Sequence, residues 1–513
     1  MLLPVKKMSP LNAAGKKKFH LQKLTSMRKR KFIQLAGTLN KDKMAAFSKH
    51  LKRLHCNDTV ALAVFDHIRK LHPFLAEEPK LEINHAYKKI FKAPLDGNKA
   101  NRTKMLNALS DLHLWLKEFL LLEKIKSDAF ESRTLWMSTL KELGLNDEYA
   151  RKAAALQAMV EKMPKANIED YMKGMAANYF FYYHLTHDKQ KLDIQALSNC
   201  GSDLDLFYAV SRLKIACEMV NRQSLLSQPP SLEVLPAIIE LSKAKSISGH
   251  PLLVLYHKVY DLISSQEDLL FAELEHLLRE NSKRVAPEEL HTILSYLHNY
   301  AAAQIRRGDE KYWGMAHRLN VFAAENGVLE KSGQISSSQF NNIVNAACLC
   351  KDLKWAISFI KKYKPLLPDS IRKDTVALAD ALVLFEKKEY RNAVHKLADA
   401  AFTDLHHAIR SKSLILRSHY EMNDENFDVD ESCAAFEIFL KRQQKPNRAA
   451  VAATLNFVKI VKKLKRQSQD KQRIINEIEN TNPLYFRPWL LEKAAEYKPK
   501  PRAGNYRSSP AQG

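Results

Sequence analysis

The sequence predicts an all-α protein, an α-solenoid of antiparallel helix pairs, from three observations. Apolar residues recur at helical spacing along most of the 513-residue chain, whereas the alternating pattern typical of strands is almost absent. Short loops separate the helical stretches, as they do in stacked helix pairs. Glycine is scarce, at 13 residues, although doubly wound nucleotide-binding folds need it at tight turns and phosphate loops. We therefore expect about 20 or more helices and no substantial β-sheet.

The N-terminal part begins with a basic segment and continues into short helices. Residues 1–27 carry prolines and a lysine run, and we expect them to form a basic flexible tail. An N-terminal helical region is predicted over 28–130. In this region Asn40 is placed to cap a helix whose apolar face includes Leu54. A long amphipathic helix is expected from about residue 101 to residue 126.

Residues 131–285 are predicted to form central helical hairpins, because helical periodicity continues and prolines such as Pro164 mark the boundaries. The aromatic run from Tyr179 to Tyr183 is apolar on every side of a helix. This pattern predicts a buried central helix rather than a ligand cage.

From residue 286 to residue 442 the sequence repeats. Small residues recur at intervals of 40, 37 and about 41 residues, and a small residue lets a second helix pack closely on the first. These residues are Ala316, Ala356, Ala393 and Ala434. A large residue lies three positions before each of the first three and fills the space toward the next pair: Trp313, Leu353 and Tyr390.

The clearest unit spans residues 374–400, DTVALADALVLFEKKEYRNAVHKLADA. Its alternating small and large positions are Ala381, Leu384, Tyr390, Ala393, Leu397 and Ala400. In this order they resemble the tetratricopeptide repeat family, although Ala377 and Leu405 stand where that family has its opening Trp and closing Pro. The resemblance implies the helix-pair architecture.

A second resemblance covers the N-terminal third, residues 28–130. It is carried by FSKHLKRLHCNDTVALAVFDHIRKLHPFL, by KKIF and by NRTKMLNALSDLHLWLKEFLLLEK. These strings are similar to a family of uncharacterised helical proteins from Bacteroidetes bacteria, whose members begin near the position of Met27. The resemblance implies a bacterial source and a helical fold, and it implies no chemistry.

The C-terminal part is predicted to close the array. Residues 443–497 are expected to form basic capping helices, and residues 498–513 a disordered tail. One helix, from about 447 to 466, has an apolar side and a lysine-rich side. A short last helix is expected to be anchored by Trp489.

The charge of the chain is concentrated at its two ends. Of a net charge of +24, residues 1–54 carry +14 and residues 441–513 carry +12, which leaves −2 for the rest. Basic clusters can bind phosphates and release counterions, but aromatic residues that stack on bases are not interleaved with these clusters. They favour weak, non-specific nucleic-acid contact at most, and a solubilising helix face is the simpler interpretation. The candidate polyanion-binding residues are Arg28, Lys29, Arg30, Lys31, Lys459, Lys462, Lys463, Lys465 and Arg466.

Motifs of known catalytic mechanism are absent from the sequence. It contains no G-x-x-x-x-G-K-[ST] loop, no G-x-S-x-G elbow and no H-E-x-x-H pair. His184 and His187 could lie on one helix face and bind a metal together, but a tetrahedral site would need one or two further ligands from elsewhere in the chain. Cys348 and Cys350 resemble half of a metal site, but no second pair of cysteines accompanies them. We therefore predict no catalytic residue, no metal and no cofactor.

The leading hypothesis is a non-enzymatic scaffold that binds another protein, since solenoids present extended surfaces. One alternative is polyanion binding through the basic ends, and another is an enzyme whose site is assembled from distant helices. No stretch of about 18 apolar residues occurs, so no membrane partner is expected. The N-terminus also lacks a signal-peptide pattern, which predicts a cytoplasmic location.

Overall fold

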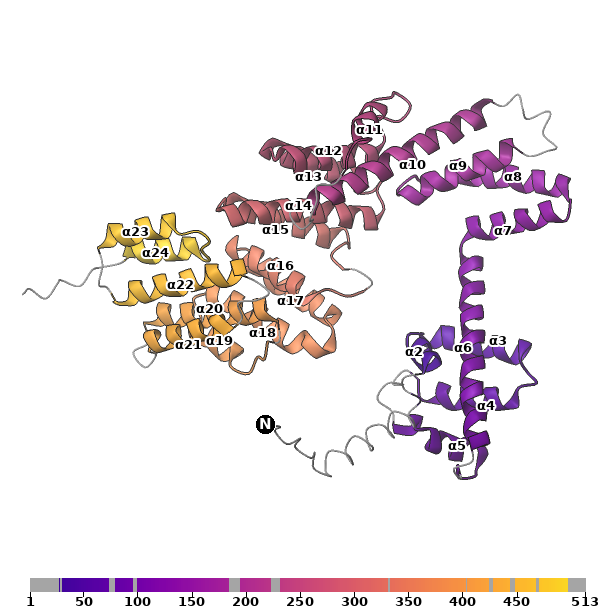
Figure 1. Cartoon of the computed structure of the whole chain (residues 1–513), viewed down its shortest axis with the longest axis horizontal. Helices are drawn as coiled ribbons and strands as arrows, with labels where there is room; N and C mark the ends of the chain where they lie inside the picture. Colours follow the sequence, from indigo (N-terminus) through magenta and orange to yellow (C-terminus); the bar gives the residue numbers. More distant parts are fainter. Residues whose placement is uncertain are drawn as a thin grey trace, which may run out of the picture. The chain divides into compact units, whose positions relative to one another are not determined.

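The computed structural model describes residues 27, 30–72, 79–95, 99–183, 194–222, 231–330, 333–402, 404–423, 428–442, 448–466 and 470–496. Within these ranges the chain forms 23 α-helices, α2 to α24, and no strand (Figure 1). The prediction of an all-α protein is therefore confirmed. None of the helices described has an apolar stretch long enough to cross a bilayer.

The helices group into two compact units. The first unit is drawn from residues 1–162 and 177–197, and the second from residues 163–176 and 198–513. Two helices contribute to both units: α9 (Ile168–Tyr182) and α10 (Ile194–Asn221). The finer boundaries predicted at residues 130 and 285 stay predictions.

The long helix α6 (Lys99–Ser127) organises the first unit, and four shorter helices contact it (Figure 1). They are α2 (Lys31–Gly37), α3 (Lys41–Leu54), α4 (Thr59–Lys70) and α5 (Ile83–Phe91), with the 3-10 helix η1 (Pro79–Leu81) before α5. The core is aromatic: the Phe47 ring lies 5.3 Å from Phe65 and 5.5 Å from Phe119, between ring centroids. The long helix predicted from about residue 101 to 126 is confirmed.

Three details of the first unit bear on the predictions. Asn40 caps α3 by accepting a hydrogen bond from the backbone N–H of Lys43 at 2.8 Å, as predicted. Leu54 is 56% exposed, so its predicted place on the apolar face is wrong. Met27 is fully buried and its N–H donates to the carbonyl of Leu81, so it belongs to the core and not to a flexible tail. Residues 1–26 lie outside the described residues.

The aromatic run at the end of α9 is not buried as predicted. Tyr179 and Tyr183 are 51% and 57% exposed, and within the run only Phe181 is buried. The other helices of the first unit are α7 (Ala129–Glu142) and α8 (Asn146–Glu161), which contact each other.

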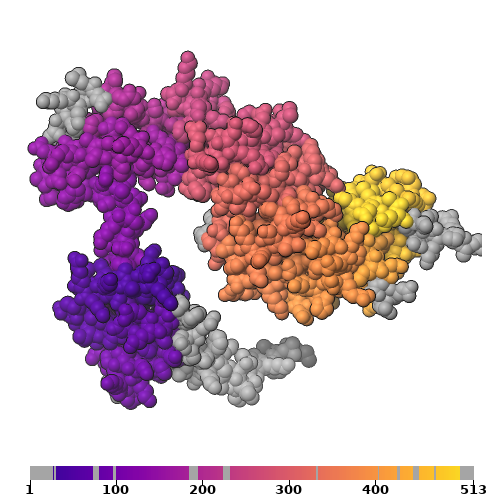
Figure 2. All heavy atoms as spheres, turned by 180° about the vertical axis from the view of Figure 1, so that it is seen from behind, coloured from indigo at the N-terminus to yellow at the C-terminus, as the bar shows by residue number. Residues whose placement is uncertain are grey.

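The second unit is a succession of helices that share one hydrophobic core. Consecutive helices contact each other, for example α12 with α13, α14 with α15 and α18 with α19, and α16, α18 and α20 also contact in series. Figure 2 shows the later helices, coloured orange to yellow, as one continuous body. The helices are α11 (Leu235–Leu241), α12 (Pro251–Ser265), α13 (Asp268–Asn281), α14 (Pro287–Arg307), α15 (Lys311–Glu325), α16 (Ser337–Leu349), α17 (Leu353–Tyr363), α18 (Asp369–Glu386), α19 (Tyr390–Leu397), α20 (Leu405–Met422), α21 (Val429–Arg442), α22 (Arg448–Arg466), α23 (Lys471–Asn480) and α24 (Arg487–Glu496), with the 3-10 helix η4 (Lys364–Leu366) after α17.

The small residues of the predicted repeat lie at helix contacts. Ala356 in α17 and Ala393 in α19 are fully buried, and Ala316 in α15 is 9% exposed, whereas Ala434 in α21 is half-buried. The Tyr390 ring packs 5.3 Å from Phe385 of the preceding helix, between centroids. Three of the four small residues are therefore buried in helices that contact the preceding helix: α15 with α14, α17 with α16, and α19 with α18.

A left-handed turn residue recurs after every second helix from α14 to α20, and the sequence did not reveal it. Four residues with left-handed backbone follow α14, α16, α18 and α20: Gly308, Lys351, Lys388 and Asn423, with φ of 98°, 60°, 63° and 47°. A left-handed residue after a helix satisfies its last carbonyls and reverses the chain. Only the first of the four is glycine, so the pattern of glycines could not have located the turns.

Candidate functional site

The predicted basic residues near the N-terminus are only partly described. Arg30 and Lys31 are exposed at the start of α2, in the first unit, and Arg28 and Lys29 lie outside the described residues. These two residues belong to the first unit, whereas α22 (Arg448–Arg466), which carries the second basic segment, belongs to the second unit.

The predicted basic side of α22 is mostly occupied by contacts within the second unit. Lys463 forms an ion pair with Glu477 of α23, with N–O distances of 2.5 and 2.7 Å. Arg466 pairs with Asp430 of α21 at 3.1 Å, and Lys465 donates to the side-chain oxygen of Asn423 at 2.9 Å. These contacts attach α22 to its neighbours and leave Lys459 and Lys462 as the cations of this segment for which no such contact is found in the described part of the chain.

The apolar side of α22 is confirmed. Val458, Val461 and Leu464 are buried. Trp489 of α24 is also buried, as predicted, and its indole N–H donates to Glu421 at 2.6 Å.

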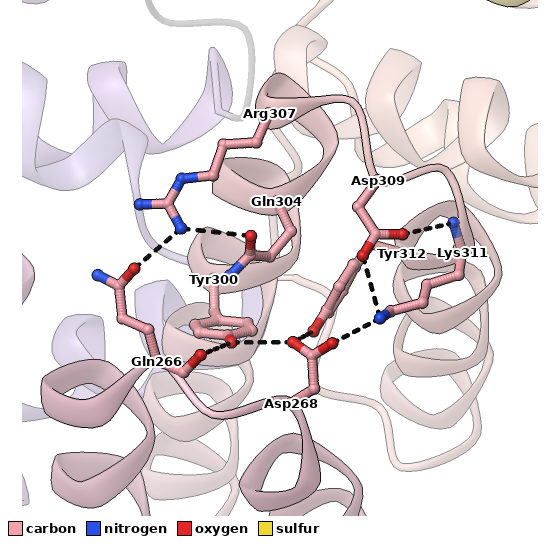
Figure 3. Close-up of polar contacts among 8 residues, drawn as sticks. All are labelled: Gln266, Asp268, Tyr300, Gln304, Arg307, Asp309, Lys311 and Tyr312. Atoms are coloured by element: carbon pink, nitrogen blue, oxygen red, sulfur yellow. Dashed lines mark hydrogen bonds and ion pairs between the residues drawn. The ribbon is translucent and has the colours of Figure 1, made fainter.

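A polar cluster connects the turn before α13 with the turn before α15 (Figure 3). The carboxylate of Asp268, the first residue of α13, accepts hydrogen bonds from Lys311, Tyr312 and, at 3.3 Å, Tyr300. Hydrogen bonds from Lys311 and Tyr312 hold the pKa of Asp268 below its usual value. The helix N-terminus also favours an ionised carboxylate.

The same cluster extends across the two turns. Arg307 donates to the side-chain oxygen of Gln266 at 2.9 Å and to that of Gln304 at 3.3 Å (Figure 3). These hydrogen bonds hold the turn before α13 against the turn before α15. The members of the cluster are about 30 to 45 residues apart in the chain, which is why no linear motif reveals it.

Buried polar pairs lie where α9 and α10 approach α12 and α14. Asp203 of α10 is 1% exposed and is held by Lys165. Burial raises the pKa of Asp203, and Lys165 opposes that shift. Tyr171 and His250 share a hydrogen bond of 2.7 Å, and burial together with the charge of Lys165 lowers the pKa of His250 to about 4. His250 is therefore neutral in the folded chain at neutral pH.

Arg417 of α20 is a buried cation with aromatic neighbours on two sides. Its guanidinium carbon lies 4.6 Å from the ring centroid of Phe385 and 4.1 Å from that of Phe486. Burial lowers its pKa to about 10, so the side chain stays charged at neutral pH. Stacking between rings stabilises a guanidinium whose water has been removed.

A shallow groove follows one face of α18 and lies between residues of α17 and α19. We call it the α18 groove. Two adjoining cavities of about 630 and 420 Å³ form it, and they share Lys364, Val376, Asp380 and Lys396. Its floor is apolar and consists of Ile357, Ile360, Val376, Val383 and Leu384. Ile357 is 44% exposed, an unusual exposure for isoleucine, although Ala356, Phe359 and Ile360 of the same helix are buried.

Charged residues form the rim of the α18 groove. Near Leu384 the rim holds Lys361, Lys364, Lys387 and Lys396 against one acid, Asp380. At the other end the cations and acids balance: Lys364, Arg372, Lys373 and Lys396 against Asp369, Asp374, Asp380 and Asp399. An apolar floor within a charged rim is the composition of protein-binding surfaces. The sequence does not reveal this site, because the charged residues of its rim are ones that any solvated helix face would carry.

The structure offers no metal centre in the part of the chain that it describes. No group of three His, Cys, Asp or Glu there is arranged to hold an ion. The six cysteines are free thiols, and burial raises the pKa of Cys348 to about 12, which keeps it protonated. His184 and His187 lie outside the described residues.

No family model matches the chain, and no curated protein or solved structure matches it. The resemblances to the tetratricopeptide repeat family and to the Bacteroidetes family stay predictions.

Proposed function

We propose that the chain is a non-enzymatic scaffold that binds a segment of another protein in the α18 groove. The observation that carries the proposal is the groove itself, which has an apolar floor and a charged rim built from α17, α18 and α19. In this proposal the second unit is an α-solenoid of antiparallel helix pairs, and its C-terminal half is tetratricopeptide-like.

The repeated turn supports the solenoid architecture. Left-handed residues after α14, α16, α18 and α20 end one helix of each pair just before the next begins. Buried alanines then allow the second helix to approach the first, as at Ala356 and Ala393. A repeat array requires similar turn geometry and similar packing at successive helix pairs.

The dimensions of the groove fit a peptide segment. The 18 residues of α18 span about 27 Å along the helix axis, at 1.5 Å per residue. This length exceeds a small metabolite and matches a helix of similar length or a shorter extended segment. Polyanion binding by the basic ends has less support, because Lys463 and Arg466 are already paired with carboxylates.

Quantitative affinity capture tests the proposal with two matched variants. Ile357→Glu places a charge on the groove floor, and Leu349→Glu changes a residue of α16 with nearly the same exposure, 44% against 43%. We expect a protein that the wild-type chain and Leu349→Glu both retain and that Ile357→Glu loses, with unchanged circular dichroism. Equal retention of every protein by all three chains would refute the groove as the binding site.

A further inference from the structure

We infer that the α18 groove selects an acidic amphipathic segment of its protein partner. This inference rests on the proposed function and adds the chemistry of the partner. It follows from the uneven charge of the rim, from the apolar floor, and from the charge of the chain's own segments.

The rim near Leu384 carries positive charge that no described carboxylate neutralises. Among the described residues, no carboxylate lies within ion-pair distance of Lys361, Lys364 or Lys387, and all three are exposed. Asp380, the acid at this end, is paired with Lys396 at 3.1 Å. Three lysines therefore face a segment in the groove with their charge available.

The other end of the groove offers no comparable excess. Arg372 pairs with Asp369 at 2.5 Å and also donates to three backbone carbonyls, those of Lys364, Pro365 and Leu367. Its guanidinium is therefore already bonded to the segment between α17 and α18. Attraction to an acidic partner is expected at the Leu384 end, and this gives the bound segment a direction.

The floor requires that the partner also present apolar side chains. Ile357 is 44% exposed, and Val376 and Leu384 are half-buried on the same surface. A nucleic acid would meet the lysines but would leave this apolar area without a partner. A helix with leucine-like side chains on one face and acidic residues beside them would contact both the apolar floor and the lysines.

The chain itself does not supply such a segment at its ends. Residues 1–26 contain six lysines and no acid, and residues 497–513 contain four lysines or arginines and no acid. Both would be repelled by the lysine rim. A second copy, with a net charge of +24, is disfavoured by the same repulsion.

Fluorescence anisotropy with designed peptides and the full chain tests the inference. One probe has leucines along one helical face and glutamates elsewhere, and the second probe has lysines in place of the glutamates. Exposed ion pairs each change affinity by about 1.4- to 5-fold, so three of them should favour the glutamate peptide by about tenfold at low salt. The preference should shrink as salt rises toward about 0.3 M, because exposed charges are screened.

Charge-reversal variants locate the effect. The triple variant Lys361→Glu, Lys364→Glu, Lys387→Glu should lose or invert the preference. Lys354→Glu, an exposed position of α17 outside the groove, should retain it. Equal affinity for the two peptides, or an unchanged preference in the triple variant, would overturn the inference. The proposed function would survive that result if Ile357→Glu still abolishes capture of a protein partner, so the two failures are distinguishable.

Discussion

Replacing Gly174 with alanine should destabilise the second unit, whereas the same change at Gly201 should not. Both glycines lie inside helices, Gly174 in α9 and Gly201 in α10. A Cβ at Gly201 would meet no atom within 4 Å. A Cβ at Gly174 would lie 2.9 Å from the carboxyl carbon of Asp203 and closer still to one of its oxygens.

The loss of unfolding free energy in Gly174→Ala depends on whether the Asp203 carboxylate can move away from the new methyl group. It is 1% exposed and held by Lys165, so it cannot rotate away without loss of that pair or separation of α9 from α10. Overpacking costs about 1–3 kcal/mol, and breaking a buried ion pair costs about 3–5 kcal/mol. Alanine in a helix gains about 1 kcal/mol over glycine, so Gly174→Ala should lose about 0–2 kcal/mol of unfolding free energy if it only overpacks the contact and about 2–4 kcal/mol if it breaks the ion pair. Gly201→Ala should gain up to about 1 kcal/mol.

Urea unfolding of the full chain, followed by circular dichroism, measures the difference between the two variants. A double-mutant cycle identifies its cause: in an Asp203→Ala background the clash is gone, and Gly174→Ala should then be nearly neutral. If Gly174→Ala is as well tolerated as Gly201→Ala in the wild-type background, the close approach of α9 to Asp203 is refuted.

Three further predictions concern the interior of the second unit. His250 binds fewer protons folded than unfolded, so stability should fall as pH drops from its unfolded pKa of about 6.5 toward its folded pKa of about 4. The full shift corresponds to about 3 kcal/mol, and partial solvent exposure reduces the expected loss between pH 7 and pH 5 to about 1–2 kcal/mol. His250→Asn should flatten this dependence in urea titrations, and an unchanged pH profile would contradict it. Arg417→Met should keep stability within about 1 kcal/mol of wild type, because the apolar chain still packs between two rings, whereas Arg417→Ala should cost about 2–4 kcal/mol. Equal losses in the two variants would show that the charge and not the packing is important there. Ala393→Leu should cost about 1–3 kcal/mol by overpacking, while Ala434→Leu, at a half-buried position, should cost less than about 1 kcal/mol in thermal unfolding. A larger loss for Ala434→Leu than for Ala393→Leu would contradict the packing role of the small residues in the predicted repeat.

Local patterns predicted the elements of this fold well. The cap at Asn40, the length of α6 and the small residues Ala356 and Ala393 are readable because each depends on a few neighbouring residues. The helical periodicity of apolar residues predicts which face of a helix is apolar, but it does not predict whether another helix packs on that face. Leu54 and Tyr179 are therefore exposed although the sequence predicted burial.

The candidate site could not be predicted for a related reason. The α18 groove combines residues of three helices, and each of its lysines alone resembles an ordinary solvated position. Whether a lysine is available depends on partners far along the chain: Lys463 has Glu477 in the next helix, while Lys361 has no carboxylate in reach among the described residues. Non-glycine residues at left-handed turns, such as Lys388, likewise carry no compositional signal.

Site-specific photo-crosslinking can show whether the α18 groove binds a protein segment. A photoreactive side chain replaces Ile357 on the groove floor, or Leu349 as the matched exposed position, and the full chain is irradiated in an extract of its source cells. We expect a discrete, protease-sensitive adduct from position 357 that is absent from position 349. Identical adducts from both positions, or a nuclease-sensitive adduct from position 357, would contradict the claim that the α18 groove binds a protein segment.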